Sequence, residues 1–419
     1  MNLSILLLTA QVVAASAGAP AAITPEQQPA PPTLTLAAAV TQARTASPRR
    51  RAAMLVADGA RDAVRFAGKL ANPVFELRTE NWNGSDRALA PDLDTFAVLT
   101  QPVELGGKRG LRRQLAESDS DVASRALASL ERALALDTVR AYVQALKARA
   151  LVEALTSNRA ALSALVDSMV LRVREGYSAE ADLLKFRTEA ARVDADIARA
   201  RLELDRGLAD LTVATGASAL IRAAQLVEPP PLPVPPPDAG AIAAAVARHP
   251  DVLEAAANVA RARRLTAYER ARQLPDALVS GGYKRTAGFD TLVLGVSLAV
   301  PIFDRNGASV ARSVGIEQGV AAARDALVHR FTNDAEALIR AAETIAERAG
   351  KAAQELLEPA EVVRRAALTA FQEGTADVLK LIDAERVYTD VHRTAIDLRL
   401  DALLATIEAR FALGEETIP

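Results

Sequence analysis

The sequence predicts a chain of mixed α and β structure, built from two copies of one long unit. Three observations support this prediction. A short strand, a very long helix and a glycine tip follow one another twice, with corresponding residues 195 to 199 positions apart. The 65-residue stretch 111–175 contains neither glycine nor proline, and the window 290–302 alternates between apolar and small or polar residues. Because solenoids repeat every 20–50 residues, this spacing indicates an internal two-fold repeat with pseudo-symmetric halves.

The two copies share short motifs, which follow one another in the same order. The first copy contains Asp94-Thr95-Phe96, Glu175-Gly176 and Ala181-Asp182-Leu183-Leu184-Lys185. The second contains Asp290-Thr291-Leu292, Glu373-Gly374 and Ala376-Asp377-Val378-Leu379-Lys380. We therefore expect each half to supply equivalent strands and helices.

Composition narrows the class of protein. Among 419 residues, 50 basic side chains balance 52 acidic ones, so no global positive field points to nucleic acid. The chain has no cysteine, which excludes disulfides, thiolate metal sites and a lipidated cysteine. Residues 1–17 have a short apolar core that ends in Ala15-Ser16-Ala17, as in a secretory signal peptide. This core is too short to span a membrane as a helix.

The remaining boundaries follow from helix and strand signals. We expect a disordered segment at 18–33 and a first structural repeat at 34–227, with a helix, a β-hairpin at 70–104 and long helices over 108–226. A proline-rich linker at 228–239 leads to a second repeat at 240–414, with a helix, a β-hairpin at 276–302 and long helices over 307–413. Residues 415–419 form a tail.

The long helices differ in regularity. An unbroken helix over 111–175 would be roughly 100 Å long. In the second copy, Gly315, Gly319, Gly350 and Pro359 predict interruptions with bends. The last helix has two apolar stripes, Val391-Ala395-Leu398-Ala402-Ala405 and Ile396-Leu400-Leu403-Ile407. Two stripes indicate two packing neighbours, as in a curved wall of helices.

The clearest strand signal lies at 290–302. One face would carry only large apolar residues: Leu292, Leu294, Val296, Leu298 and Val300. Thr291, Gly295, Ser297 and Ala299 would lie on the other face. This alternation fits a strand of a membrane barrel with lipid outside and water inside. Six of the chain's fifteen Phe, Trp and Tyr residues lie in or beside the two hairpins: Phe75, Trp82, Phe96, Tyr283, Phe289 and Phe303. This concentration favours either ordinary strand enrichment or an interfacial aromatic girdle.

Four strands and four long helices in two equivalent pairs, behind a signal peptide, resemble the TolC family of outer-membrane efflux channels. Two runs are similar to the cobalt-zinc-cadmium branch of that family: Ala71-Asn72-Pro73-Val74-Phe75-Glu76-Leu77 and Gln101-Pro102-Val103-Glu104-Leu105-Gly106-Gly107-Lys108-Arg109. The resemblance implies a homotrimer whose twelve strands form one outer-membrane barrel, continued by a coiled-coil α-helical tunnel in the periplasm of a Gram-negative bacterium. It also implies two partners, a periplasmic adaptor and a proton-driven inner-membrane pump of the resistance-nodulation-division type.

Elementary physics also favours the trimer, because four strands cannot close a barrel and open strand edges are not tolerated in lipid. The resemblance further implies that the tips at Gly176 and Gly374 contact the adaptor. Asp377, just after the second tip, is expected to cap the returning helix and, in a trimer, to form an acidic ring at the periplasmic gate. Lys380 and Asp182 are the other gate residues that we predict.

Nothing in the sequence supports catalysis, a cofactor or a metal site. His249, His329 and His392 are far apart, and methionine occurs only at 1, 54 and 169. We therefore expect a passive conduit for heavy-metal cations or other toxic compounds, in contact with outer-membrane lipid. Two alternatives stay open: a periplasmic coiled-coil adaptor or scaffold, and a similar channel for organic drugs or protein secretion.

Overall fold

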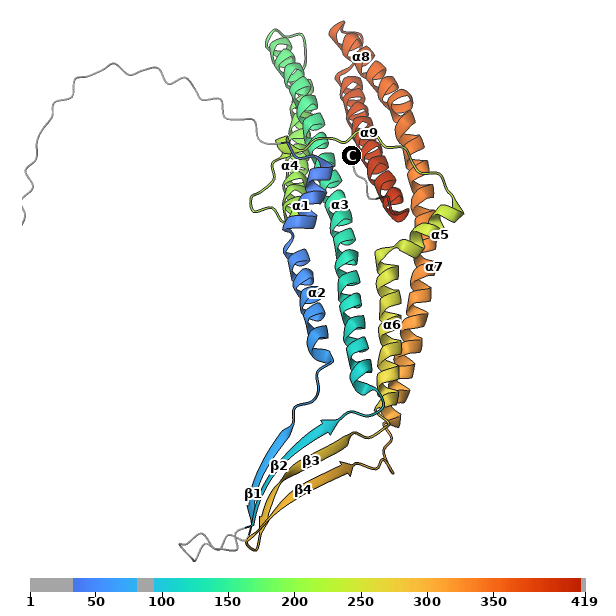
Figure 1. The fold of residues 1–419 in the computed structure, drawn as a ribbon. Coiled ribbons are helices and arrows are strands. Elements are labelled where there is room, and N and C mark those ends of the chain that lie inside the picture. The colour runs from blue at the N-terminus through green and yellow to red at the C-terminus, as the bar shows by residue number, and fades with distance from the viewer. Residues whose placement is uncertain (1–32, 81–93, 416–419) are drawn as a thin grey trace, which may run out of the picture. The chain divides into compact units, whose positions relative to one another are not determined.

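The computed structural model describes residues 33–80 and 94–415 (Figure 1). The predicted signal peptide at 1–17, nearly all of the segment 18–33, the end of the tail 415–419 and the middle of the first hairpin lie outside the described residues. Within residues 33–80 and 94–415, no helix combines the length and the apolar character needed to cross a membrane.

Nine α-helices and four strands make up the described part of the chain. The first half contains α1 (Leu36–Ala46), α2 (Pro48–Ala67), β1 (Val74–Glu80), β2 (Asp94–Val103), α3 (Lys108–Arg174) and α4 (Glu180–Thr215). The second half contains α5 (Ala239–Arg248), α6 (Pro250–Ala271), β3 (Ala277–Thr286), β4 (Phe289–Leu298), α7 (Gly307–Ala352), α8 (Glu358–Gln372) and α9 (Val378–Ala412). Residues 227–238, rich in proline, form no helix or strand between the halves.

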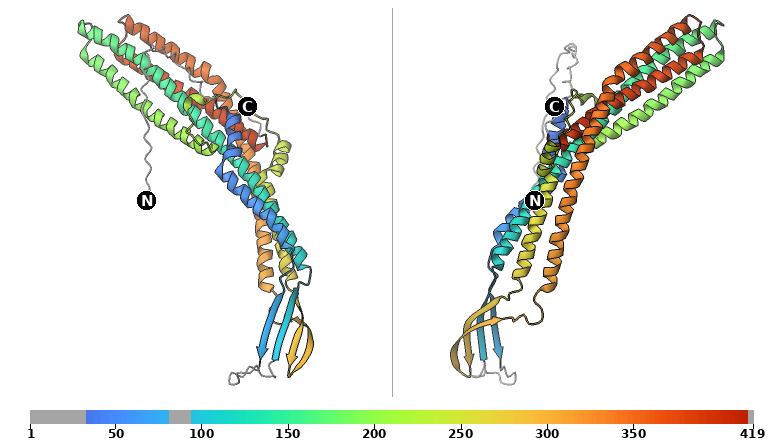
Figure 2. Two further views of the ribbon diagram at one scale, coloured as in Figure 1. Left: turned by 60° about the vertical axis from the view of Figure 1, so that its left-hand side comes forward. Right: turned by 90° about the vertical axis from the view of Figure 1, so that its right-hand side faces the viewer.

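The strands form one antiparallel sheet in the order β1-β2-β3-β4 (Figures 1 and 2). The central pair, β2 and β3, joins the two halves of the chain, with Val98 opposite Gly282. A Cβ atom at Gly282 would overlap the backbone of Ala97 and Val98, so this close approach requires glycine. The pair β1–β2 lies within the predicted range 70–104 and the pair β3–β4 within 276–302, and the two pairs lie side by side in the sheet.

The outer strand β4 confirms the predicted alternation, with one correction at its end. Leu292, Leu294 and Val296 are 86%, 87% and 75% exposed, and Leu298 on the same face is 48% exposed. The opposite face carries Val293 in addition to the predicted small and polar residues. Val300 and Ala299 follow the last residue of β4, so they are not strand residues. Pro301 donates no backbone hydrogen bond, which favours an end of pairing before it.

The long helices confirm most of the helical prediction. Helix α3 runs unbroken for 67 residues. The predicted interruptions of the second long helix at Gly315, Gly319 and Gly350 are wrong, since α7 continues through all three. Packing against α6 and α9 outweighs the cost of about 1 kcal/mol that each glycine brings. The predicted interruption near Pro359 is correct, because a π-helical turn at Ala353–Leu357 precedes α8 and places this proline in its first turn.

The core lies along the helices. Tyr142 of α3 is completely buried, and its hydroxyl lies 2.6 Å from the carbonyl of Leu34 and 2.7 Å from that of Val227. Helix α9 packs against both α3 and α7, which confirms the two neighbours that its two apolar stripes predicted. Polar contacts also join α9 to α3, including Lys147 with Asp401 (3.0 Å) and Arg140 with Glu408 (2.7 Å). The two halves therefore share one packed body.

Candidate functional site at the helical tips

The two helical hairpins, α3–α4 and α8–α9, end in turns of the same construction. Gly176 and Gly374 have φ angles of +80° and +76°, a conformation that glycine adopts without a steric penalty. The amide of Gly176 donates to the carbonyl of Val173 (3.1 Å), and that of Tyr177 to Arg172 (2.8 Å). Gly374 and Thr375 repeat these bonds with Phe371 and Ala370. This is the Schellman pattern, which satisfies the last free carbonyls of a helix.

A small apolar core holds the two tips together. Phe186 of α4 and Phe371 of α8 meet edge to face, with ring centroids 5.8 Å apart. Around them are Met169, Leu183, Val378, Leu381 and Ile382, all buried. Arg172 of α3 donates to the carbonyl of Gln372 (3.1 Å) and lies over the ring of Phe371. The end of one hairpin is thus anchored to the end of the other.

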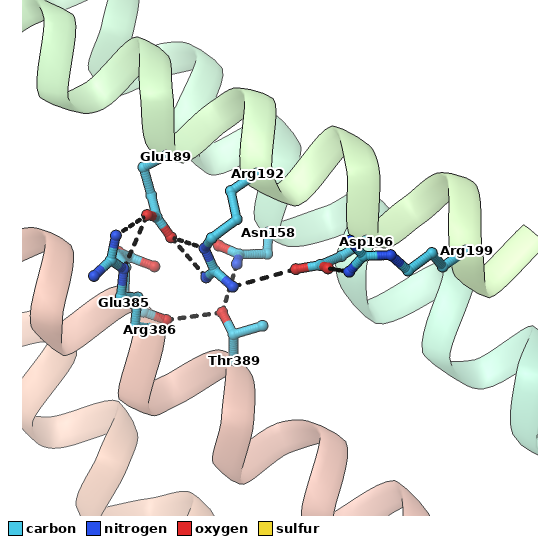
Figure 3. Close-up of polar contacts among 8 residues, drawn as sticks. All are labelled: Asn158, Glu189, Arg192, Asp196, Arg199, Glu385, Arg386 and Thr389. Atoms are coloured by element: carbon cyan, nitrogen blue, oxygen red, sulfur yellow. Dashed lines mark hydrogen bonds and ion pairs between the residues drawn. The ribbon is translucent and has the colours of Figure 1, made fainter.

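Next to this core, one buried carboxylate links the two returning helices, α4 and α9. Glu189 of α4 is 2% exposed. It accepts hydrogen bonds from Arg192 on its own helix (2.7 Å) and from Arg386 of α9 (2.5 Å), as Figure 3 shows. Arg192 also contacts Asp196 (3.2 Å), which pairs with Arg199 (2.8 Å). Among the ion pairs of the described residues, Glu189–Arg386 is the one that joins α4 to α9.

The surroundings of Glu189 favour its ionised form. Burial alone would raise the pKa of this carboxyl group, but the hydrogen bonds from Arg386 and Arg192 outweigh burial and hold the pKa below its ordinary value. The carboxylate is therefore charged at neutral pH, and its bridge to α9 is complete.

A second buried carboxylate, Glu385 of α9, has weaker compensation. It is 2% exposed, and its nearest cation is Arg364 of α8, at 3.5 Å. Burial raises the pKa of Glu385, and Arg364 offsets this effect only in part. The backbone carbonyl of Glu385 accepts from Thr389, whose hydroxyl accepts in turn from Asn158 of α3 (2.5 Å) (Figure 3).

The predicted gate residues lie close to these turns but are not equivalent. Asp377 is the N-cap residue of α9, is exposed, and makes no capping hydrogen bond through its side chain. The prediction that its carboxylate caps the helix is therefore wrong. Lys380 is exposed in the following turn, and no ion pair between it and Asp377 is present among the described side chains.

Asp182 occupies a different position relative to its tip. It lies inside the first turn of α4, six residues after Gly176, whereas Asp377 follows Gly374 by three. Asp182 also pairs with Lys185 at 3.0 Å. Counted from the tip glycines, the counterpart of Asp377 is Ala179, the N-cap residue of α4. The similarity of the two sequence runs therefore does not make the two carboxylates structural equivalents.

The sequence reasoning missed Glu189, Glu385 and their arginine partners, although it contained a signal. Glu189 falls within the apolar series Leu183, Phe186, Ala190 and Val193, on the buried side of α4. Glu385 lies four residues after Leu381 on the buried side of α9. The two glutamates are 196 residues apart, close to the spacing of the matching motifs, but they follow their tip glycines by 13 and 11 residues and so are not equivalent positions. A carboxylate within an apolar stripe in both copies marks a position where a charge is buried.

A shallow groove lies between α4 and α9 beside this network. Its volume is about 570 Å³, and its lining includes Leu184, Lys185, Leu379 and Arg386. Leu184 and Leu379 are 53% and 54% exposed. The returning helices therefore meet at their buried side and leave an open, partly apolar surface at the other.

The histidines have structural environments. His249 is the N-cap residue of α6, and its ring stacks on Phe331 with centroids 4.0 Å apart. His392 lies beside Tyr388, and burial lowers its pKa. Across the residues that the structure describes, no three His, Asp or Glu side chains gather in a way that could hold a metal ion.

Comparison with known proteins adds to this geometry. No protein-family model matches the sequence. The chain is 28% identical over 360 residues to the cobalt-zinc-cadmium resistance protein CzcC of Cupriavidus metallidurans, covering 84% of this chain and 83% of that protein. Among solved structures, that of CusC, a protein that forms a transmembrane channel, superposes on this chain with a TM-score of 0.75 at 16% identity. The match covers 90% of this chain and 91% of CusC. The CmeC outer membrane channel of Campylobacter jejuni gives a TM-score of 0.76 at 13% identity, covering 91% and 86%.

The chain therefore has the fold of these outer-membrane channels, and most of its length is similar in sequence to CzcC. The predicted resemblance to the cobalt-zinc-cadmium branch of these channels is thereby confirmed over most of the chain. The turns that join α3 to α4 and α8 to α9 lie at the end of the helices far from the sheet (Figure 2).

Proposed function

We propose that this channel is the outer-membrane exit of a tripartite efflux system and that it conducts heavy-metal cations. The observation that carries the cargo assignment is the similarity to CzcC, a cobalt-zinc-cadmium resistance protein, over most of both chains. The fold supports a conduit, because long helices continue a sheet with an exposed apolar face. Transport then depends on an open path, and the cargo passes without a resident metal site.

The sheet edges support a trimer as the working form. In the described part of the sheet, β1 and β4 each pair on one side only, so both outer edges carry unpaired backbone groups. Such edges are not tolerated in a bilayer. Pairing β1 of one copy with β4 of the next would close twelve strands by three-fold symmetry. The face of Leu292, Leu294, Val296 and Leu298 would then contact lipid, with Val300 just beyond the strand.

In this proposal the two tips contact a periplasmic adaptor, which would connect the channel to a proton-driven inner-membrane pump. Tyr177, directly after Gly176, is 79% exposed and suits a test of this contact. Gly374 suits it less, because its φ of +76° would strain any side chain. Tyr177→Ala should abolish resistance and adaptor crosslinking while leaving the trimer intact. Leu220→Ala, at an exposed apolar position that follows the other end of α4 from the tips, should keep both.

The gate in this proposal lies where α4 and α9 approach the tips. Three copies of exposed Asp377 around one axis would attract cations at the periplasmic mouth. Lys380 would not add to this attraction because its charge is positive. Asp182 would add less than Asp377 because Lys185 neutralises it. The Glu189–Arg386 bridge would fix α9 beside α4.

A deletion strain tests the cargo. We expect loss of this gene to increase sensitivity to cobalt, zinc or cadmium salts, and we expect the wild-type channel to restore growth while the Tyr177→Ala variant fails to do so. Increased sensitivity to organic dyes and detergents alone, with unchanged metal tolerance, would instead identify a channel for organic compounds. Release of the protein with the soluble periplasm would favour a scaffold.

A further inference from the structure

All four connections between the sheet and the helices share one composition. They run over residues 68–73, 104–107, 272–276 and 299–306, and the second leads directly into the first turn of α3, which contains Arg109 (Figure 1). Each pairs an exposed apolar side chain with an exposed cation: Leu70 with Lys69, Leu105 with Arg109, Leu274 with Arg272, and Phe303 with Arg305. We call these eight residues the collar. Phe303 is 99% exposed, which is rare for a phenylalanine unless another apolar phase covers it.

The collar region is strongly basic in a chain that is nearly neutral. The stretches 66–73, 104–113, 269–276 and 300–312 hold nine Lys and Arg against four Asp and Glu, whereas the whole chain has a net charge of −2. Three of the four carboxylates are in ion pairs: Asp276 with Lys108 (2.6 Å), Glu104 with Arg112, and Glu269 with Arg272 (3.1 Å). The fourth, Asp304, accepts a hydrogen bond from the amide of Asn306 (2.8 Å). The four stretches therefore carry more positive than negative charge.

Three collar cations have neutral contacts that orient them. Lys69 lies over the ring of Phe66, 4.5 Å from its centroid. Arg109 donates to the carbonyl of Gly68 (2.5 Å), and Arg305 to that of Pro301 (3.3 Å). Within the described residues, none of these three side chains forms an ion pair with a carboxylate. Their charge is available to an external anion.

We propose that the collar binds the phosphate groups of anionic phospholipids in the periplasmic leaflet of the outer membrane. The apolar member of each pair would enter the acyl boundary, while the cation would contact the headgroup phosphate. The inference rests on the outer-membrane placement of the channel, because the collar lies where the sheet ends and the periplasmic helices begin. Charge complementarity and the apolar partner select a lipid over a free anion.

The test is a lipid titration of the purified, detergent-solubilised channel, followed by its thermal unfolding. The triple variant Lys69→Gln, Arg109→Gln, Arg305→Gln removes the three cations that lack a carboxylate partner. The matched control, Arg206→Gln, Arg330→Gln, Arg340→Gln, removes three exposed charges from helices away from the collar. A third variant, Lys69→Arg, Arg109→Lys, Arg305→Lys, keeps the charge and detects a purely structural effect of substitution.

Phosphatidylglycerol should raise the Tm of the wild type, the control and the charge-conserving variant, and phosphatidylcholine should raise it much less. For the triple variant, the phosphatidylglycerol concentration at half-effect should increase about fivefold for each cation removed. Equal effects of the two lipids, or an unchanged half-effect concentration in the triple variant, would overturn the proposal. An equal shift with inorganic phosphate would reassign the collar to free anions. Metal tolerance of a deletion strain is measured separately, so failure of the cargo proposal would leave this result unaffected.

Discussion

Glu189 and Glu385 are both 2% exposed, yet their surroundings shift their pKa values in opposite directions. Two arginines stabilise the charge of Glu189, whereas Glu385 faces one arginine at 3.5 Å. Ionised Glu189 therefore stabilises the fold above the ordinary pKa of 4.5, and this contribution is lost as the pH falls through the lower, folded value. Ionisation of Glu385 instead destabilises the fold. This cost appears as the pH rises above 4.5 and is complete above the raised pKa of the folded state.

Thermal unfolding of two variants tests these signs. At neutral pH, Glu189→Gln should lower the free energy of unfolding by about 1–3 kcal/mol. The loss should not exceed this range, because both arginines are partly exposed and solvent screens their charge. Glu385→Gln should raise the stability at the same pH, since it removes a buried charge. Both differences from the wild type should shrink in buffers more acidic than 4.5, where the carboxyl groups are protonated. A loss of stability for Glu385→Gln at neutral pH would show that its bond to Arg364 outweighs burial.

The gate proposal makes a separate prediction at Asp377. Its exposed carboxylate has no capping bond, whereas Asp182 is paired with Lys185 at 3.0 Å. In planar bilayers, Asp377→Asn should therefore reduce cation preference more than Asp182→Asn does. The measurement is the reversal potential in a salt gradient. If Asp377→Asn leaves it unchanged in normally assembled channels, the acidic ring is not part of the selectivity.

Strand β4 carries the prediction at the level of elements. Leu294 is 87% exposed on the uniformly apolar face, and Ser297 lies on the opposite face. If the apolar face meets lipid, Leu294→Arg should cost about 2–4 kcal/mol in each chain. We expect less assembled protein in the outer membrane for Leu294→Arg than for Ser297→Arg, measured by detergent extraction and quantification of the oligomer. Equal assembly of the two variants would contradict the assignment of the lipid face.

Local signals were sufficient for most elements. The absence of Gly and Pro over 111–175 predicted α3, period-two alternation predicted β4, and Gly176 and Gly374 predicted the tips because only glycine enters their conformation easily. Contacts between residues that are far apart in the sequence are not predicted by any such local pattern. Arg386 is 197 residues from Glu189, so its role depends on how α4 and α9 pack. Packing also keeps α7 helical through its glycines, against their intrinsic propensity.

The repeat is approximate at the scale of the whole molecule, and its departures are informative. Each half buries one glutamate on its returning helix, but among the described residues only Glu189 pairs with an arginine of the other half. Both copies also supply two strands, yet the central β2–β3 pair joins the halves into one sheet. The equivalent outer edges remain on β1 and β4, where a neighbouring copy would pair.

The central claim is that copies of this chain close one barrel in the outer membrane. The most direct test is the mass of the particle that detergent extracts from that membrane, measured by native mass spectrometry. The chain of 44.2 kDa, less any signal peptide removed on export, should appear as a trimer, and it should resist release until detergent is added. A monomer released with the soluble periplasm would contradict the account.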